Sequence, residues 1–152
     1  MINVNVAVDT KSWNKKNINS TEYFTKKLKK ISNIVNFFKK KDITFTIFLT
    51  NSANLKKINK KFRKKNKATD VLSFPFFFKK ELKYKKEKNI YIGDIAISYE
   101  IIKNRTEKNS FFLEFDKVWV HGLLHLIGYD HKKNKDYNVM NRIEKKILTS
   151  IV

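Results

Sequence analysis

The sequence predicts an α+β fold, in which a single layer of about four strands packs with about five helices. Three observations favour it: short segments with alternating apolar residues, longer segments with apolar residues at helical spacing, and the mixing of the two along the chain. No linker, repeat or change of composition divides the 152 residues. We therefore expect residues 1–152 to form a single domain.

Four segments have the pattern of strands. Residues 2–8 alternate isoleucine and valine with smaller or polar residues, which is the period of a strand with one buried face. The later strands are expected around Ile43, Phe45, Ile47 and Leu49, in ATDVLSFPF up to Pro75, and in NIYIGDIAIS. In the last of these the apolar positions change parity around Gly93 and Asp94, which predicts a β-bulge.

Helices are expected between and after these strands. Apolar residues at helical spacing predict an amphipathic helix over about residues 21–38 and a second helix within NLKKINKKF. Towards the end of the chain we expect a short helix near 99–106, a helix that ends at a cluster of histidines, and a last helix over about 134–149. The lysine-rich stretch FFFKKELKYKKEKN is expected to be a long exposed loop.

The net charge of +20 is typical of proteins that bind a polyanion such as nucleic acid. Lysine, asparagine, isoleucine and phenylalanine are abundant while alanine, glycine and arginine are scarce, a bias that codon drift towards A and T also produces. The charge leaves two interpretations open: contact with nucleic acid or a ribonucleoprotein, and a lysine-rich surface that is simply solvated.

The composition also bounds the compartment. There is no cysteine, so neither disulfides nor thiolate metal ligands are available. No apolar run approaches the length of about 18 residues that a membrane span needs, and the first residues lack the basic and apolar blocks of a secretory signal. We expect a cytoplasmic protein with no membrane partner.

All three histidines lie in the eleven-residue stretch HGLLHLIGYDH. His121 and His125 are four residues apart, so on a helix they can point at a common atom. Gly128 can end that helix in a left-handed conformation and let the chain bring His131 back towards them. Three imidazoles with an open fourth position are the ligand set of a catalytic zinc site. The sequence predicts one zinc ion per chain.

The same spacing fits the zinc-peptidase pattern HExxHxxGxxH, in which the glutamate acts as general base. Here that position is Gly122. Because glycine cannot take a proton, the sequence argues against a peptidase.

HGLLHLIGYDH resembles the signature HGxLHLxGYDH of the YbeY family of bacterial metal-dependent endoribonucleases. NKKFRKKNKATDVLSFPF resembles the family's second hallmark, an arginine a few residues before TDVLSFP, and GDIAIS resembles its third. The blocks follow the family order and the resemblance covers nearly the whole chain. Ala68 stands where the family commonly has proline, which affects the stiffness of the loop more than the chemistry.

The resemblance implies a single-strand-specific endoribonuclease of ribosomal RNA maturation, notably at the 3′ end of 16S RNA, with a part in ribosome quality control. It implies single-stranded regions of ribosomal RNA and the ribosome or its small subunit as partners. It also implies that His121, His125 and His131 hold zinc, and that Arg63 is a functional arginine.

The chemistry of phosphodiester cleavage agrees with these assignments. A guanidinium binds two phosphate oxygens with parallel hydrogen bonds, so Arg63 is expected to be catalytic together with His121 and His125. Ser73 is a candidate for contact with RNA. Asp130 lies in the histidine loop, where it either orients an imidazole or caps the next turn, and both roles stay open.

Two other classes of function remain open at this point. One is a ribosome assembly factor whose metal is structural, which the charge of +20 fits equally well. The other is a metallohydrolase that acts on a smaller phosphoester.

Overall fold

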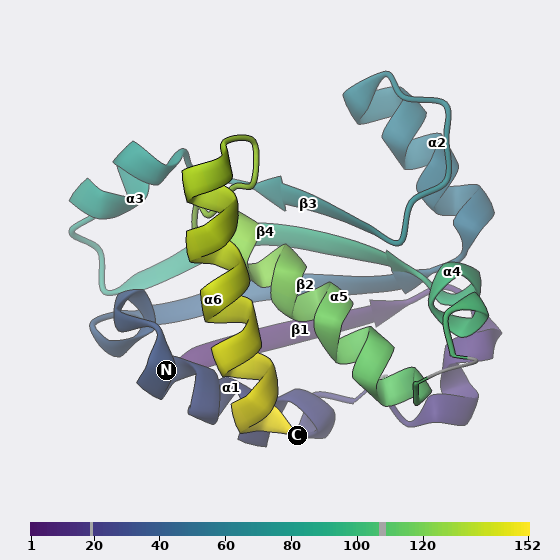
Figure 1. Ribbon diagram of the computed structural model, residues 1–152, viewed down its shortest axis with the longest axis horizontal. Coiled ribbons are helices and arrows are strands. Elements are labelled where there is room, and N and C mark those ends of the chain that lie inside the picture. The colour runs from purple at the N-terminus through teal and green to yellow at the C-terminus, as the bar shows by residue number, and fades with distance from the viewer. Residues whose placement is uncertain (19, 107–108) are drawn as a thin grey trace.

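The computed structural model describes residues 1–18, 20–106 and 109–152. Its sheet has four strands in the order β1-β2-β4-β3. Strands β1 (Ile2–Val8), β2 (Asp42–Thr50) and β4 (Asn89–Ser98) are parallel, and β3 (Val71–Pro75) pairs with β4 in the antiparallel direction at one edge (Figure 1). The predicted α+β fold and its four strands are confirmed.

One face of the sheet carries the main hydrophobic core. Alternate residues of β2 are fully buried on this face: Ile43, Phe45, Ile47 and Leu49. Helices α1 (Glu22–Ile34), α5 (Phe111–Leu126) and α6 (Asn134–Ile151) cover the face with their apolar stripes (Figure 1). The short 3-10 helices η1 (Lys11–Lys16) and η2 (Asn36–Lys39) add the buried rings of Trp13 and Phe38.

The carboxylate of Asp116, on α5, lies inside this core. It accepts hydrogen bonds from the Tyr23 hydroxyl at 2.9 Å and the Trp119 indole at 2.8 Å, and it pairs with the Lys27 ammonium at 2.5 Å. Burial, followed by the charge of Asp116, raises the pKa of Tyr23, so the phenol keeps the proton that it donates. A buried carboxylate with three donors joins α1 to α5.

The opposite face of the sheet is covered differently. Helix α2 (Ser52–Arg63) packs there, where Leu55, Leu72 and Ala96 form a second, smaller apolar cluster. The short helix α4 (Tyr99–Asn104) follows β4 and lies beside α2 (Figure 1). The described residues place α1, α5 and α6 on the first face and α2 on the second.

Two expectations about helices are wrong. The helix expected over 21–38 ends at Ile34, because Val35 is extended (φ −102°, ψ 112°) and η2 then buries Phe38 in a separate turn. The stretch expected to be an exposed loop contains helix α3 (Lys79–Tyr84), which buries Leu82 against the main core. Leu82 is the one residue of α3 that is buried, so the helix has no periodic apolar stripe in the sequence.

The predicted β-bulge is present next to Gly93. Thr44 pairs with Tyr91 and Phe45 with Gly93, so Ile92 has no partner across the β2–β4 pair. Gly93 has a φ of +137°, and a Cβ at this position would lie 2.2 Å from the carbonyl oxygen of Phe74. Only glycine therefore lets β3 pair with β4 here.

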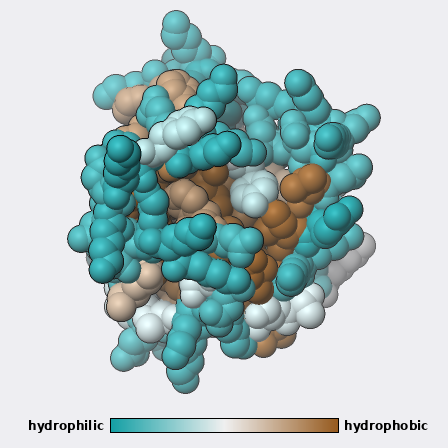
Figure 2. All heavy atoms as spheres, turned by 90° about the vertical axis from the view of Figure 1, so that its left-hand side faces the viewer, coloured by the Kyte–Doolittle hydropathy of each residue, from teal (hydrophilic) through white to brown (hydrophobic). Residues whose placement is uncertain are grey.

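One end of the molecule has a mostly polar surface. Figure 2 shows this end, where hydrophilic side chains surround smaller areas of hydrophobic atoms. None of the helices in residues 1–18, 20–106 and 109–152 combines the length and the hydropathy needed to cross a membrane.

Candidate metal centre

The last two turns of α5 position the first two imidazoles. His121 and His125 lie one turn apart on this helix, and their Nε2 atoms are 3.0 Å from each other. Gly128 follows with a φ of +95°, and its N–H donates to the carbonyl of His125 at 3.0 Å. A Cβ at Gly128 would lie 2.7 Å from the Cβ of Lys79, so the turn needs glycine for both its conformation and its space.

The turn after Gly128 brings His131 to the other two histidines. Its ring centroid lies 5.5 Å from that of His121 and 5.1 Å from that of His125. One nitrogen from each of the three rings lies within 4.8 Å of the others. The structure thus gathers all three histidines that the sequence predicted as ligands.

These side chains fit a divalent transition metal. Burial lowers the pKa of His125, and the neighbouring rings of His121 and His131 lower it further. A neutral imidazole keeps the lone pair that binds a metal. Three nitrogen donors suit zinc and also copper, nickel or cobalt, so a metal site is supported without fixing the ion.

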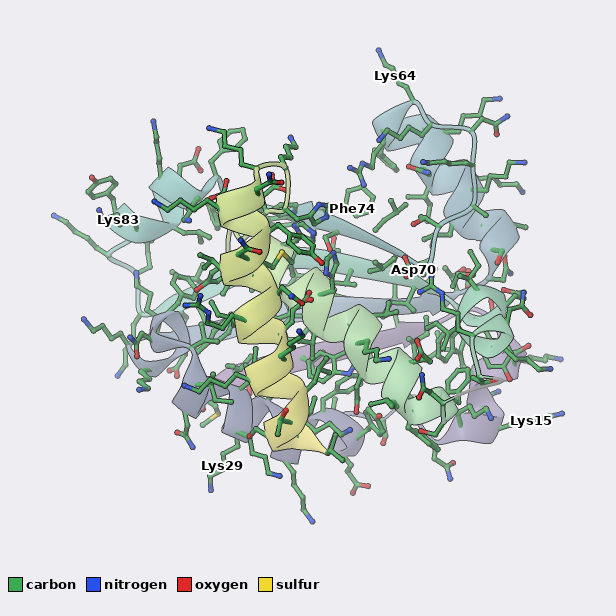
Figure 3. The ribbon with its side chains drawn as sticks, viewed as in Figure 1. Lys15, Lys29, Lys64, Asp70, Phe74 and Lys83 are labelled. Atoms are coloured by element: carbon green, nitrogen blue, oxygen red, sulfur yellow. The ribbon has the colours of Figure 1, made fainter. Side chains whose placement is uncertain are left out.

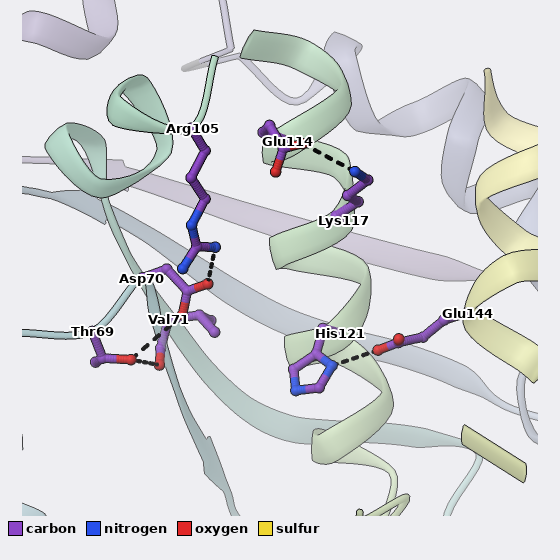
Figure 4. Close-up of polar contacts among 8 residues, drawn as sticks. All are labelled: Thr69, Asp70, Val71, Arg105, Glu114, Lys117, His121 and Glu144. Atoms are coloured by element: carbon purple, nitrogen blue, oxygen red, sulfur yellow. Dashed lines mark hydrogen bonds and ion pairs between the residues drawn. The ribbon is translucent and has the colours of Figure 1, made fainter. Parts of the chain in front are cut away.

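Glu144 contacts the histidine cluster, and the sequence reasoning missed it. It comes from α6, and its Oε1 lies 2.5 Å from the Nδ1 of His121, with both side chains partly buried (Figure 4). A carboxylate at this position can accept a proton from Nδ1, and in that tautomer the Nε2 of His121 would be available to ligate. A signal did exist: Glu144 occupies the apolar stripe of Met140, Ile147 and Ile151 at helical spacing.

Gly122 is explained by packing. The Ser73 hydroxyl on β3 donates to the Gly122 carbonyl at 3.2 Å. A Cβ on Gly122 would lie 2.9 Å from the Cγ2 of Ile95 and 3.2 Å from the Ser73 Oγ. Strands β3 and β4 therefore approach α5 closely at Gly122, the position where zinc peptidases carry their glutamate. Ser73 lies against the residue that follows His121.

Arg63 does not lie in the histidine cluster, and Asp130 contacts the backbone of the histidine loop. Arg63 is the exposed last residue of α2, the helix on the opposite face of the sheet, and within the described chain it makes no hydrogen bond or ion pair. Asp130 Oδ1 accepts from the backbone N–H of His131 at 2.7 Å, so this carboxylate holds the loop. The imidazole of His121 meets Glu144 instead.

A polar cleft of about 430 Å³ opens beside His121 between α5 and α6. Two ion pairs line it, Arg105 with Asp70 at 2.5 Å and Lys117 with Glu114 at 3.0 Å, and the contact between His121 and Glu144 lies beside them (Figure 4). Arg105 is thus held by a carboxylate, whereas Arg63 is not.

A helix that ends in converging imidazoles, closed by a glycine turn and lying over a mixed sheet, forms a site of the kind that metal-dependent enzymes use. The family model "Endoribonuclease YbeY" matches residues 8–152. The chain therefore belongs to the YbeY endoribonuclease family.

Individual relatives agree with this assignment. Endoribonuclease YbeY of Pelagibacter ubique is 44% identical over 151 residues, which cover 97% of this chain and 94% of the relative. Endoribonuclease YbeY of Buchnera aphidicola from Acyrthosiphon pisum is 37% identical over 154 residues, covering 99% and 93%. The solution structure of a Thermotoga maritima protein matches with a TM-score of 0.62 at 26% identity, covering 99% of this chain and 89% of that one.

Proposed function

We propose that this chain is a zinc-dependent, single-strand-specific endoribonuclease of ribosomal RNA maturation, including the 3′ end of 16S RNA, with a part in ribosome quality control. Residues 1–152 form one catalytic domain that holds one zinc ion. The observation that carries the proposal is the convergence of His121, His125 and His131 in a chain of the YbeY family. The proposed partners are single-stranded ribosomal RNA and the ribosome or its small subunit, in the cytoplasm.

The side chains divide the work as follows. The three histidines would hold the ion, which when bound polarises a phosphoryl oxygen and activates water at neutral pH. Glu144 keeps the ring of His121 in the orientation and tautomer that ligation needs. Arg63 would bind two oxygens of a phosphate as charge develops, and the hydroxyl of Ser73 lies beside α5 where it can contact the RNA strand.

Cleavage of a single-stranded RNA with and without a chelator tests the proposal. Purified protein is expected to cut the single strand, to lose this activity with the chelator, and to regain it when zinc is restored. The same sequence annealed into a duplex should be cut far more slowly. Turnover of small nucleotide esters but not RNA would contradict the proposal, and so would tight binding to the small subunit by a protein that never cuts RNA.

Loss of the Glu144 carboxylate should weaken metal binding. Removing such a partner of a metal-bound histidine typically lowers affinity about 10- to 100-fold, so Glu144→Ala should bind zinc correspondingly less tightly. Competition with a coloured chelator measures this affinity directly. Glu144→Gln keeps an oxygen acceptor and should recover part of the loss.

Glu114→Gln is the matched control for Glu144. Glu114 lines the same cleft and pairs with Lys117, with no contact to an imidazole, so its variant should bind zinc as the parent does. Equal zinc affinity in Glu144→Ala and the parent would show that α6 does not tune the site.

A further inference from the structure

The second face of the sheet carries a groove that the histidine site does not use. It lies between α2 and the strands and has a volume of about 520 Å³, within the range of small-molecule sites. Its apolar lining consists largely of the side chains of Phe48, Ile58, Phe62, Phe74 and Ala96. The main core is on the other face, so these aromatic rings serve a separate surface.

Two aromatic pairs lie along this face, and one ring of each pair is exposed to solvent. Phe62 is 63% exposed and meets Phe74 edge to face, with ring centroids 5.8 Å apart. Phe76 is 59% exposed and lies 5.0 Å from the ring of Tyr91. Large exposed rings are costly on a free surface, and each offers an open face on which another planar group can stack.

The groove also holds hydrogen-bond acceptors. Asp94 and Thr46 line it, and the Tyr91 hydroxyl donates to Asp94 Oδ1 at 2.5 Å. One carboxylate oxygen has its donor in Tyr91, and a carboxylate can accept several more hydrogen bonds. Amino groups on the edges of nucleobases are donors that a carboxylate accepts. The lining therefore suits a flat group with an amino edge.

The charge of α2 indicates which kind of polymer would bring such flat groups to the groove. Residues 52–69 contain eight basic and no acidic side chains, and the eight are exposed: Lys56, Lys57, Lys60, Lys61, Arg63, Lys64, Lys65 and Lys67. Figure 3 shows Lys64 at the tip of α2, pointing away from the sheet. Phosphates suit this basic rim and bases suit the aromatic groove, which is the arrangement of single-strand binding surfaces.

Strand β3 joins the groove to the histidine site. Neighbouring residues of a strand point to opposite faces, and here Ser73 contacts α5 while Phe74 lies in the groove. β3 is an edge strand in the described sheet, so a flexible chain can pass around it from one face to the other. We propose that this groove binds unpaired bases of the RNA whose phosphodiester reaches the histidines. This inference rests on the proposed function.

Binding of two single strands tests the groove. One is a short single-stranded RNA that is checked on a denaturing gel to be intact after each measurement, and the other is a strand of equal length and charge that lacks its bases. The parent protein, with zinc bound, should prefer the base-bearing strand. Phe62→Ala should bind that strand about fivefold to a hundredfold more weakly, as expected for the loss of one stacked base, and should bind the base-free strand as before.

Two further variants make the result specific. Phe62→Trp keeps a stacking face and should restore the preference for bases. Phe78→Ala removes a ring that is 80% exposed but lies outside the groove, and should change neither affinity. An equal loss on both strands in Phe62→Ala, or a parent with no preference for bases, would overturn the inference, the latter being the result if the groove binds a protein instead.

The outcome is separate from that of the cleavage test. A parent that cuts RNA in a chelator-sensitive way but shows no preference for bases would keep the proposed activity and remove the groove. A parent that prefers base-bearing strands through Phe62 without cutting them would keep the groove as a binding surface and remove the catalytic proposal.

Discussion

His125→Ala is expected to lose stoichiometric zinc and to cleave single-stranded RNA at least about a thousandfold more slowly than the parent. The Nε2 of His125 lies 3.0 Å from that of His121, so its removal takes one of the converging donors out of the site. A catalytic ion contributes several kcal/mol of charge stabilisation, and about 4 kcal/mol corresponds to about a thousandfold in rate. Elemental analysis and single-turnover cleavage measure the two quantities.

The ring of His125 is partly buried, so the variant needs a control for folding. Circular dichroism and the melting temperature should stay close to those of metal-free parent protein. Glu114→Gln, in the neighbouring cleft, should keep both zinc and activity. Full zinc content after alanine replaces His121, His125 and His131 together would place the metal elsewhere.

Arg63→Lys is expected to reduce the cleavage rate about a hundredfold while changing RNA affinity only modestly. The variant keeps the positive charge and loses the pair of parallel hydrogen bonds that a guanidinium offers to a phosphate. Loss of one preorganised donor costs on the order of 3 kcal/mol in the transition state. Single-turnover cleavage and equilibrium binding on the same RNA measure the two effects, and zinc content confirms an intact site.

The position of Arg63 makes this comparison informative. It ends α2 on the face opposite α5, and no carboxylate holds it within the described chain, so it reaches the cleaved phosphate only if the RNA passes around the edge strand β3. A rate equal to that of the parent would remove Arg63 from catalysis. Equal losses of binding and rate would make it a docking residue and favour an assembly factor over an enzyme. Arg142→Lys, a change on the exposed side of α6, is the matched control.

The elements that the sequence predicted are those with strong local signals. The alternation of Ile43, Phe45, Ile47 and Leu49 fixes a strand with one buried face, and a parity change marks the bulge at Gly93. The spacing of the histidines and the glycine turn predicts their convergence because helix geometry and a positive φ are local properties. The cluster could therefore be predicted before any tertiary contact was known.

The features that the sequence reasoning did not predict depend on contacts between distant segments. Glu144 is 23 residues from His121, and only the packing of α6 on α5 brings its carboxylate to the ring. Leu82 is buried because α3 folds back on the core, and Val35 is extended because the chain must turn before β2. The groove combines residues from α2, β2, β3 and β4, so no single segment carries its pattern.

The hydrogen bond between His121 and Glu144 has a consequence for biosynthesis. Translation produces the chain from its N-terminus, so all three imidazoles exist before the carboxylate of α6 does. A chain that stops after His131 would contain the entire histidine motif, yet it would lack the buried Ile147 and the acceptor that orients His121. Completion of the last helix, rather than the appearance of the motif, is the event that finishes the centre. A copy that lacks α6 therefore lacks the carboxylate beside His121, even though its histidine motif is complete.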